Sequence, residues 1–310
     1  MVQVGNWFFS PLVQSFPTNV FPNSALWSVT PAAGAPADLN YQIQVSWPLE
    51  WSQRNTNSTV ETMYILDGNA LGFGAAEAFR RRRPVEFNQP DTIVVSIGYP
   101  IGDAIQTPGA PYSPQRSIDF QPPVCLNCSQ PAAPGVRSGA EDFISFIDKS
   151  LRPFVKHHVF PATKFNRDAI YGHSFGGLFT LYAMISHPKL FDTFLSASPA
   201  LFWNDGYILS NLTLLEAHRL NNKTKPALQI TYGGLEQFPK RRPGESDADW
   251  AFRESLLMSM KMTDYCNQLY SSLKASKNLR DVNLNVYPNS YHAMVGGAAI
   301  SDGIDYFLYN

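Results

Sequence analysis

The alternation of apolar and polar positions predicts a chain in which short buried strands alternate with amphipathic helices. Dense apolar runs, typical of strands that are buried on both faces, occupy residues 62–66, 92–97, 191–197 and 228–232, and a further strand is expected at 282–287. Helical periodicity is found at residues 72–83, 140–158, 206–220, 246–275 and 293–308. Strands that alternate with helices build a mostly parallel sheet with helices on both faces, so the predicted fold class is α/β.

The N-terminal part of the chain follows the pattern less closely. Residues 1–39 are rich in Pro, Asn, Ser and Ala, so we expect an irregular arm there and a single domain over 40–310. Residues 41–47 alternate strictly between apolar and polar, which predicts a half-exposed antiparallel strand at the edge of the sheet. Residues 99–138 show no periodicity and are rich in Pro and Gly. Segments of more than about 15 such residues are usually functional or disordered, so we expect a pocket wall.

A glycine-flanked serine stands between a predicted strand and a predicted helix. The sequence Gly172-His-Ser-Phe-Gly176 fits the pattern G-x-S-x-G, with a short apolar run before it and an amphipathic pattern after it. This order of strand, tight turn and helix is the context of a nucleophile elbow, in which bulk is excluded two residues to either side of the serine. Ser174 is therefore predicted to be a catalytic nucleophile. The alternative is a glycine-rich turn in a domain without catalytic function.

A histidine and an acid follow the serine in the order found in α/β-hydrolases. His292 comes directly after the last predicted strand, and it is predicted to be the general base. The acid should lie in a loop that follows a strand between the two. Glu236 fits best because it follows the strand at 228–232 across a Gly-Gly turn, and Asp205 is the second candidate.

Further residues are predicted to form the rest of the site. The backbone N–H of Phe175 and those of Gly68 and Asn69, which follow an earlier strand, are the expected donors of an oxyanion hole. Arg116 is a candidate for binding polar or anionic substrate groups, and the alternative is a structural ion pair with Asp119. Two aromatic residues, together with Phe175 and parts of 99–138, complete the expected substrate-binding surface: Trp203 and Tyr291.

Composition and charge exclude several other classes of protein. A net charge of −1 gives no sign of a nucleic-acid or membrane-surface partner, and no apolar run reaches the roughly 18 residues of a spanning helix. The N-terminus lacks the pattern of a signal peptide, so a cytoplasmic protein is expected. Cys125 and Cys128 could form a local bridge or half of a metal site, but no second cysteine pair completes the site. We therefore expect no metal and no cofactor, and the oligomeric state is left open.

Several motifs together resemble the esterase D-type putative esterase family. They are Tyr64-Ile-Leu-Asp-Gly-Asn69, Arg116-Ser-Ile-Asp119, the elbow, Ser196-Ala-Ser-Pro199 with Trp203-Asn204, and His292. The resemblance covers about residues 60–308 and is greatest to siderophore esterases of the bacterial enterobactin type and the fungal triacetylfusarinine type. It implies an α/β-hydrolase fold, an acyl-enzyme mechanism, a role in iron homeostasis and a small-molecule ester substrate such as a ferric siderophore.

Two features depart from this resemblance, and alternatives stay open. Ala-Met-Val follows His292 where related enzymes often have a Gly-Ser-Val type sequence, and the segment 99–138 has no obvious match in the bacterial enzymes. Some siderophore esterases work with a Ser–His pair without an acid. The alternative functions are a general carboxylesterase of the S-formylglutathione hydrolase or feruloyl esterase type, and a non-catalytic binding protein on a hydrolase scaffold.

Overall fold

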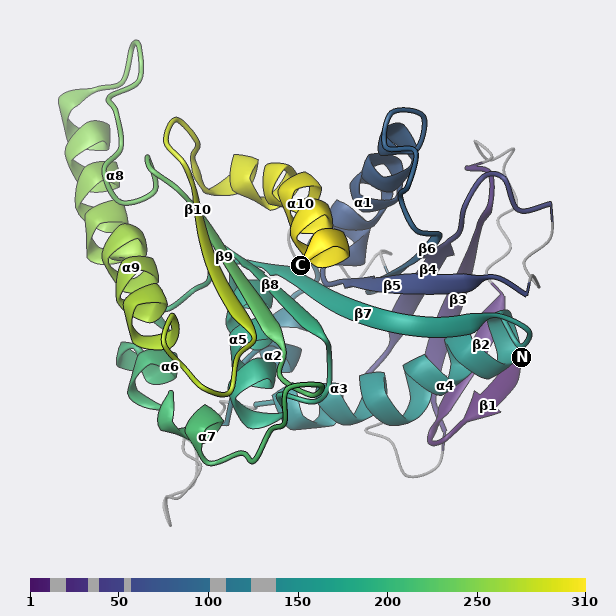
Figure 1. Cartoon of the computed structure of the whole chain (residues 1–310). Coiled ribbons are helices and arrows are strands. Elements are labelled where there is room, and N and C mark those ends of the chain that lie inside the picture. The colour runs from purple at the N-terminus through teal and green to yellow at the C-terminus, as the bar shows by residue number, and fades with distance from the viewer. Residues whose placement is uncertain (12–20, 33–38, 53–56, 101–109, 124–137) are drawn as a thin grey trace. The chain divides into compact units, whose positions relative to one another are not determined.

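The computed structural model describes residues 1–11, 21–32, 39–52, 57–100, 110–123 and 138–310. These residues form two compact units, Met1–Ala169 and Ile170–Asn310. The predicted α/β fold is confirmed, since parallel strands alternate with helices in the described chain (Figure 1). Cys125 and Cys128, and much of the predicted pocket wall over 99–138, lie outside the described residues.

The first unit contains six strands and most of a seventh. The strands are β1 (Val2–Val4), β2 (Trp7–Pro11), β3 (Ser24–Pro31), β4 (Tyr41–Ser46), β5 (Thr59–Ile65), β6 (Thr92–Gly98) and β7 (Lys164–His173), which ends in the second unit. The helices are α1 (Gly68–Arg82), α2 (Arg116–Asp119), α3 (Ala140–Phe146), the π-helical η1 (Ile147–Leu151), α4 (Arg152–Phe154) and the π-helical η2 (Val155–Val159).

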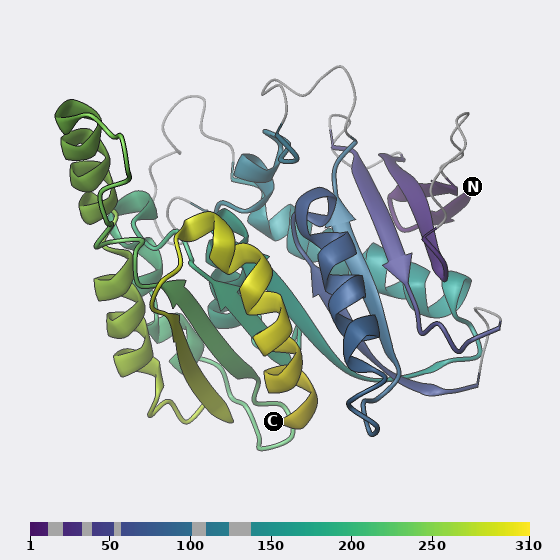
Figure 2. The ribbon, with the colours of Figure 1, turned by 90° about the horizontal axis from the view of Figure 1, so that it is seen from above.

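The sheet of the first unit combines parallel and antiparallel pairs. Its strands follow the order β1-β2-β3-β4-β6-β5, in which β5 and β6 are parallel and the other neighbours are antiparallel. Helix α1 packs on β4, β5 and β6 (Figure 2). The antiparallel strands β1–β4 therefore continue the sheet beyond β6, which pairs in parallel with β5 on its other side.

Two predictions for the N-terminal residues were wrong. Residues 1–39 are not an irregular arm, because β1, β2 and β3 lie there and bury Trp7, Phe9 and Trp27. These rings meet the helical run α3–α4, and the ring centroids of Phe9 and Phe154 are 3.9 Å apart. The strand at Tyr41 is antiparallel, as predicted, but β3 and β6 flank it and most of it is buried. The strand β4 is not at the edge of the sheet because β3, β2 and β1 lie beyond it.

The second unit contains β8 (Thr193–Ala197), β9 (Ala227–Gly233) and β10 (Asp281–Tyr287), which pair in parallel in that order. Its helices are α5 (Phe175–Ser186), the 3₁₀ turn η3 (Trp203–Asp205), α6 (Tyr207–Ser210), α7 (Thr213–Glu216), α8 (Asp247–Ser259), α9 (Met262–Leu273) and α10 (His292–Tyr309). Figure 1 shows α10 on one face of these strands, with α5 and α9 on the other. The helix predicted over 246–275 is broken at Lys261, whose φ of 50° is left-handed.

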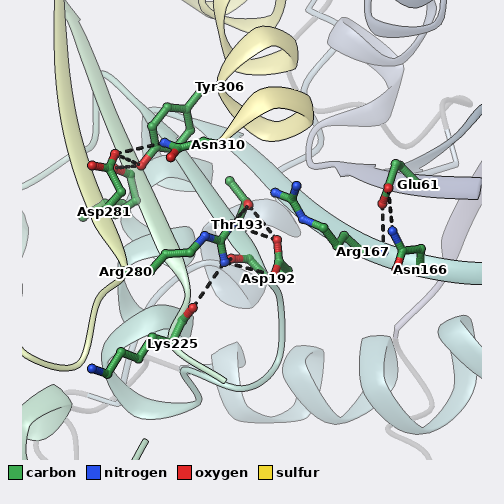
Figure 3. A network of polar contacts seen from close by, with 11 residues as sticks. Glu61, Asn166, Arg167, Asp192, Thr193, Lys225, Arg280, Asp281, Tyr306 and Asn310 are labelled. Carbon is green, nitrogen blue, oxygen red and sulfur yellow. Dashed lines mark hydrogen bonds and ion pairs between the residues drawn. The ribbon is translucent and has the colours of Figure 1, made fainter. Parts of the chain in front are cut away.

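Polar contacts close the amino ends of β8, β9 and β10. Arg280 precedes β10, and its guanidinium binds both carboxylate oxygens of Asp192 at 2.9 and 3.0 Å and the carbonyl of Lys225 at 3.2 Å (Figure 3). At the same end, Asp281 accepts hydrogen bonds from Tyr306 and Asn310 of the terminal helix. These contacts, one ion pair and several hydrogen bonds, occupy the amino ends of the strands. In open α/β sheets a site is expected at the carboxyl ends of the strands.

Candidate active site

The predicted nucleophile lies in a strained turn between β7 and α5. Ser174 has φ 59° and ψ −118°, and a positive φ is uncommon for a residue that carries a Cβ. Its N–H donates to the carbonyl of Ala197 at 3.0 Å, while its own carbonyl accepts from the N–H groups of Leu178 and Ala200 at 3.0 and 3.1 Å. The half-buried Ser174 is therefore held in this conformation by β8 and by its own helix.

Glycine is required beside the serine because two segments of backbone nearly touch there. A Cβ added to Gly172 would lie 2.1 Å from the carbonyl oxygen of Gly176. A Cβ added to Gly177 would lie 2.9 Å from the carbonyl oxygen of Ala197. Gly172 of the G-x-S-x-G pattern thus has the steric role that the sequence predicted for it.

A short hydrogen bond joins His292 to Glu236. His292 Nδ1 lies 2.6 Å from Glu236 Oε2, and the side chain of Glu236 is 2% exposed whereas that of His292 is 42% exposed. The other carboxylate oxygen, Oε1, accepts hydrogen bonds from the Ser198 hydroxyl and the Gly233 N–H, both at 2.6 Å. Because three donors surround Glu236, it is oriented as an acceptor for the Nδ1–H of His292, which leaves Nε2 as the basic nitrogen.

Backbone contacts along β8 connect this pair to the serine. Ala197 accepts the N–H of Ser174, and the next residue, Ser198, donates its hydroxyl to Glu236. Ser198 has a positive φ of 41°, the second such residue beside the site. Two consecutive residues of the second unit, Ala197 and Ser198, thus bind the backbone of Ser174 and the carboxylate of Glu236 respectively. Sequence reasoning missed Ser198 as a partner of the acid, although its motif Ser196-Ala-Ser-Pro199 was noted.

The neighbour of the serine in the elbow, His173, holds the backbone of His292. Its Nε2 lies 2.9 Å from the carbonyl oxygen of His292, and because a carbonyl only accepts, Nε2 carries the proton. The two imidazole rings are 4.4 Å apart between centroids, and His173 is 5% exposed. Gly296 of α10 packs against the same ring, since an added Cβ would lie 3.2 Å from it. His173 therefore fixes where α10 begins.

We expect the substitution His173→Phe to lower kcat by about tenfold to a hundredfold, because small displacements of a catalytic group have effects of this size. Phenylalanine keeps the ring contact but removes the donor to the carbonyl of His292. KM should change little, since His173 is buried away from substrate. Steady-state kinetics with a p-nitrophenyl ester would measure this, with His187→Phe, at the end of α5, as the control. Wild-type kcat in a folded His173→Phe protein would contradict the assignment.

The one cysteine of the second unit is unsuited to be a nucleophile. Cys266 is fully buried in α9, and its thiol contacts the sulfur of Met262 at 3.7 Å. Burial raises the pKa of the Cys266 thiol well above its ordinary value, and the charge of Glu236 adds to this shift. The thiol therefore stays protonated at neutral pH, and Ser174 has no competitor from it.

In the first unit, Arg116 is bound to an aspartate other than the predicted one. Its Nε and Nη2 donate to the two oxygens of Asp67 at 2.6 and 2.8 Å, and the side chain of Asp67 is 2% exposed. Asp119, the partner in the alternative that the sequence left open, accepts hydrogen bonds from Tyr99 and Gln115. The carboxylate paired with Arg116 is that of Asp67. Two of the five Arg116 donors are committed to Asp67, so they are unavailable to an anionic substrate.

The Asp67 pair fixes the turn that was predicted to supply oxyanion donors. Asp67 has φ 53° and directly precedes α1, whose first residues are Gly68 and Asn69. The side chain of Asn69 accepts from the N–H of Tyr99 at 2.7 Å and donates to its carbonyl at 2.9 Å. The backbone at the start of α1 is therefore anchored to the end of β6. The oxyanion roles of Gly68 and Asn69 stay predictions.

We expect Arg116→Met to destabilise the protein by about 3–5 kcal/mol at neutral pH, because it leaves the buried Asp67 carboxylate unpaired. Burial raises the pKa of Asp67, and the hydrogen bonds and the charge of Arg116 oppose this shift by lowering the pKa. Without Arg116 the folded pKa rises further above the unfolded value, so the folded state takes up a proton more readily. The loss of stability should therefore shrink as pH falls through that raised pKa.

Thermal unfolding of Arg116→Met between pH 5 and pH 8 would measure this dependence. The double variant Asp67→Asn/Arg116→Met serves as the control, since it has no carboxylate to protonate and should show little of the pH dependence. A loss of stability for Arg116→Met that is the same at both ends of this range would contradict the assignment.

The remaining predicted residues, Tyr291, Trp203 and Asp205, belong to the second unit. The hydroxyl of Tyr291, which directly precedes His292, accepts from the N–H of Lys240 and donates to its carbonyl, each at 3.1 Å. Trp203 is half-buried, and its ring meets that of Tyr207 with centroids 5.5 Å apart. The second candidate acid, Asp205, is exposed in η3, and it is Glu236 that binds His292.

Within the described residues, no group of three or more His, Cys, Asp or Glu side chains is arranged to hold a metal ion. No helix in the same part of the chain is long and apolar enough to cross a membrane.

Comparisons with known proteins show the family of the chain. Residues 37–257 match the family described as putative esterase. The chain is 37% identical over 314 residues to the siderophore enterobactin esterase of Emericella nidulans, with 98% of each chain covered. It is 32% identical over 295 residues to the siderophore triacetylfusarinine C esterase of Aspergillus fumigatus, with 94% of this chain and 96% of that one covered.

Solved structures agree as well. The siderophore hydrolase EstA from Aspergillus nidulans has a TM-score of 0.82 and 36% sequence identity, with 95% of this chain and 98% of that one covered. This likeness confirms the predicted α/β-hydrolase fold.

Proposed function

Because the chain belongs to the putative esterase family and is a carboxylic ester hydrolase, we propose that it cleaves the ester bonds of a siderophore through an acyl-enzyme on Ser174. The observation that carries the mechanism is the hydrogen bond of 2.6 Å between His292 and the buried Glu236, together with the strained backbone conformation of Ser174. The names of two relatives, which cover nearly the whole chain, support the substrate class.

The reaction starts with a proton transfer from the serine. Nε2 of His292 takes the hydroxyl proton of Ser174 while the oxygen attacks the ester carbonyl, which gives a tetrahedral intermediate. The intermediate collapses to an acyl-serine, and His292 returns the proton to the departing alkoxide. Water then attacks the acyl-serine with His292 again as base, so each cycle consumes one water and yields one acid and one alcohol.

Glu236 supports His292 in both halves of this cycle. As an acceptor it keeps the proton on Nδ1, so that Nε2 faces the reaction with its lone pair. Its negative charge stabilises the imidazolium that forms when His292 holds the serine proton. Because the three donors around Glu236 are already in place, no reorganisation is needed during the reaction.

The oxyanion and substrate-binding residues complete the proposal. The N–H of Phe175, at the start of α5, is proposed as one oxyanion donor, where the helix dipole also favours negative charge. Gly68 and Asn69 are proposed as the source of the second donor. Trp203 and Tyr291 are proposed to contact the substrate, whereas Arg116 is proposed to act through Asp67 rather than on the substrate.

Incubation with two trilactone siderophores, enterobactin and triacetylfusarinine C, each with and without iron, would test the proposal. Mass spectrometry should detect linear products that have gained one water for each ester cleaved. Ser174→Ala is the matched control for spontaneous hydrolysis. Turnover of a p-nitrophenyl ester without turnover of either chelator would instead indicate a general carboxylesterase.

A further inference from the structure

A short basic segment lies beside the catalytic histidine, and its charges have no use in the reaction described above. Lys240, Arg241 and Arg242 follow Glu236 in the loop between β9 and α8, and all three are exposed. The loop is tied to the residue before His292, because the backbone N–H and carbonyl of Lys240 both bind the Tyr291 hydroxyl at 3.1 Å. The segment therefore has a fixed place at the rim of the site.

Helix α8 holds the segment from the other side. Arg253 donates two hydrogen bonds of 2.7 Å to the two carboxylate oxygens of Glu245, and a third of 2.9 Å to the carbonyl of Lys240. Glu245 also accepts the backbone N–H of Arg242 at 2.9 Å. The hydrogen bond with Arg253, with smaller effects of Arg242, lowers the pKa of Glu245 to about 2. Glu245 is thus ionised at neutral pH, and the clamp persists under physiological conditions.

Within the described residues, the ion pairs leave two cations of the segment without a direct carboxylate partner. Arg253 is paired with Glu245, and the guanidinium of Arg241 is paired with Asp247 at 2.5 Å. Among the described residues, no ion pair joins Lys240 or Arg242 to a carboxylate. The guanidinium of Arg242 instead lies over the Tyr291 ring, 5.8 Å from its centroid. One of these two cations therefore lies over the ring of Tyr291, the residue that precedes His292 in the chain, and the side chain of His292 is itself 42% exposed.

We propose that Lys240 and Arg242 form a cationic rim that binds the anionic part of the substrate and makes ferric catecholate esters preferred over ferric hydroxamate esters. This inference rests on the proposed function. Three catecholates around ferric iron leave the complex with a net negative charge, whereas three hydroxamates neutralise it. The guanidinium of Arg242 suits a planar, anionic catecholate, since it donates hydrogen bonds and stacks on aromatic rings. Arg116, which the sequence suggested for this role, is occupied by Asp67.

The test compares the double variant Lys240→Gln/Arg242→Gln with Arg241→Gln. Arg241 lies between the other two and carries the same charge, but it is already paired with Asp247, which makes it a matched control. The probes are ferric enterobactin, which is anionic, and two neutral esters, ferric triacetylfusarinine C and p-nitrophenyl butyrate. The double variant should lose about tenfold or more in kcat/KM on ferric enterobactin, because a cleft lined by one sign of charge concentrates its substrate to that extent.

The expected pattern is selective. Both neutral esters should change less than about threefold in the double variant, and Arg241→Gln should resemble wild type on all three probes. Salt should lower the wild-type kcat/KM on ferric enterobactin, and the double variant should lose most of this dependence because screening acts on exposed charges. An equal loss on anionic and neutral esters, no loss, or a wild-type preference for the neutral chelator would overturn the cationic rim. Failure of the wild type to cleave either chelator would instead overturn the proposed function.

Discussion

Replacement of Ser174 by alanine is expected to lower kcat by about 10⁴-fold or more, which is the loss seen when the nucleophile of such a triad is removed. Without the hydroxyl no acyl-enzyme forms, and only binding and oxyanion stabilisation remain. The fold should be preserved, because Ser174 is held by its backbone: its N–H and carbonyl make three hydrogen bonds that alanine retains. The side chain contributes no bond on which the elbow depends.

Two measurements separate loss of chemistry from loss of fold. Turnover of p-nitrophenyl butyrate and labelling by a fluorophosphonate should both vanish in Ser174→Ala, while its thermal unfolding stays close to wild type. Ser186→Ala, at the end of the same helix, removes a hydroxyl that donates to the carbonyl of Tyr182 and should keep both activities. Labelling of the Ser174→Ala protein at the wild-type rate would mean that another residue is the nucleophile.

The sequence predicted the buried strands and the helices well, because each has its own pattern of apolar positions and the structure has an element of the expected type there. The apolar runs at 62–66, 92–97 and 228–232 became β5, β6 and β9. The pattern failed where contacts with distant parts of the chain determine the secondary structure. The strands β1–β3 are short and separated by residues rich in Pro and Asn, so the alternation of apolar and polar positions in them is hard to recognise from the sequence. It becomes clear in the structure, where Trp7 and Phe9 pack on α3–α4. Lys261 breaks a helix without any Gly or Pro to mark the position.

The site was predictable in its order along the chain but not in its supporting contacts. Ser174, Glu236 and His292 were predicted because each follows a strand in hydrolase order, and parallel strands end at one edge of a sheet. The partners of these residues come from side chains far away in sequence. Ser198 reaches Glu236 across 38 residues, His173 reaches His292 across 119, and Asp67 reaches Arg116 across 49. No local pattern encodes such pairs, which is why the sequence suggested a substrate group or the nearer Asp119 as the partner of Arg116, and not Asp67.

The substitution Glu236→Gln is expected to lower kcat by about 10²–10⁴-fold, because it reverses the tautomer of His292. The carboxylate accepts three hydrogen bonds, two on Oε1 from Ser198 and Gly233 and one on Oε2 from His292. An amide has a single acceptor oxygen, and it will face the side with two donors. Its NH₂ group then donates to Nδ1, which moves the imidazole proton to Nε2, the atom that must accept the serine proton.

This reasoning distinguishes Glu236 from the alternatives. Proton NMR of the wild type should show a strongly downfield Nδ1–H resonance that disappears in Glu236→Gln, while KM and thermal unfolding change little. Asp205→Asn, the control, should keep both the resonance and the activity, since Asp205 is exposed and Glu236 already occupies His292 Nδ1. If Glu236→Gln retains most activity and Asp205→Asn loses it, the acid is Asp205. If both variants remain active, catalysis rests on Ser174 and His292, as in the siderophore esterases that work with a dyad.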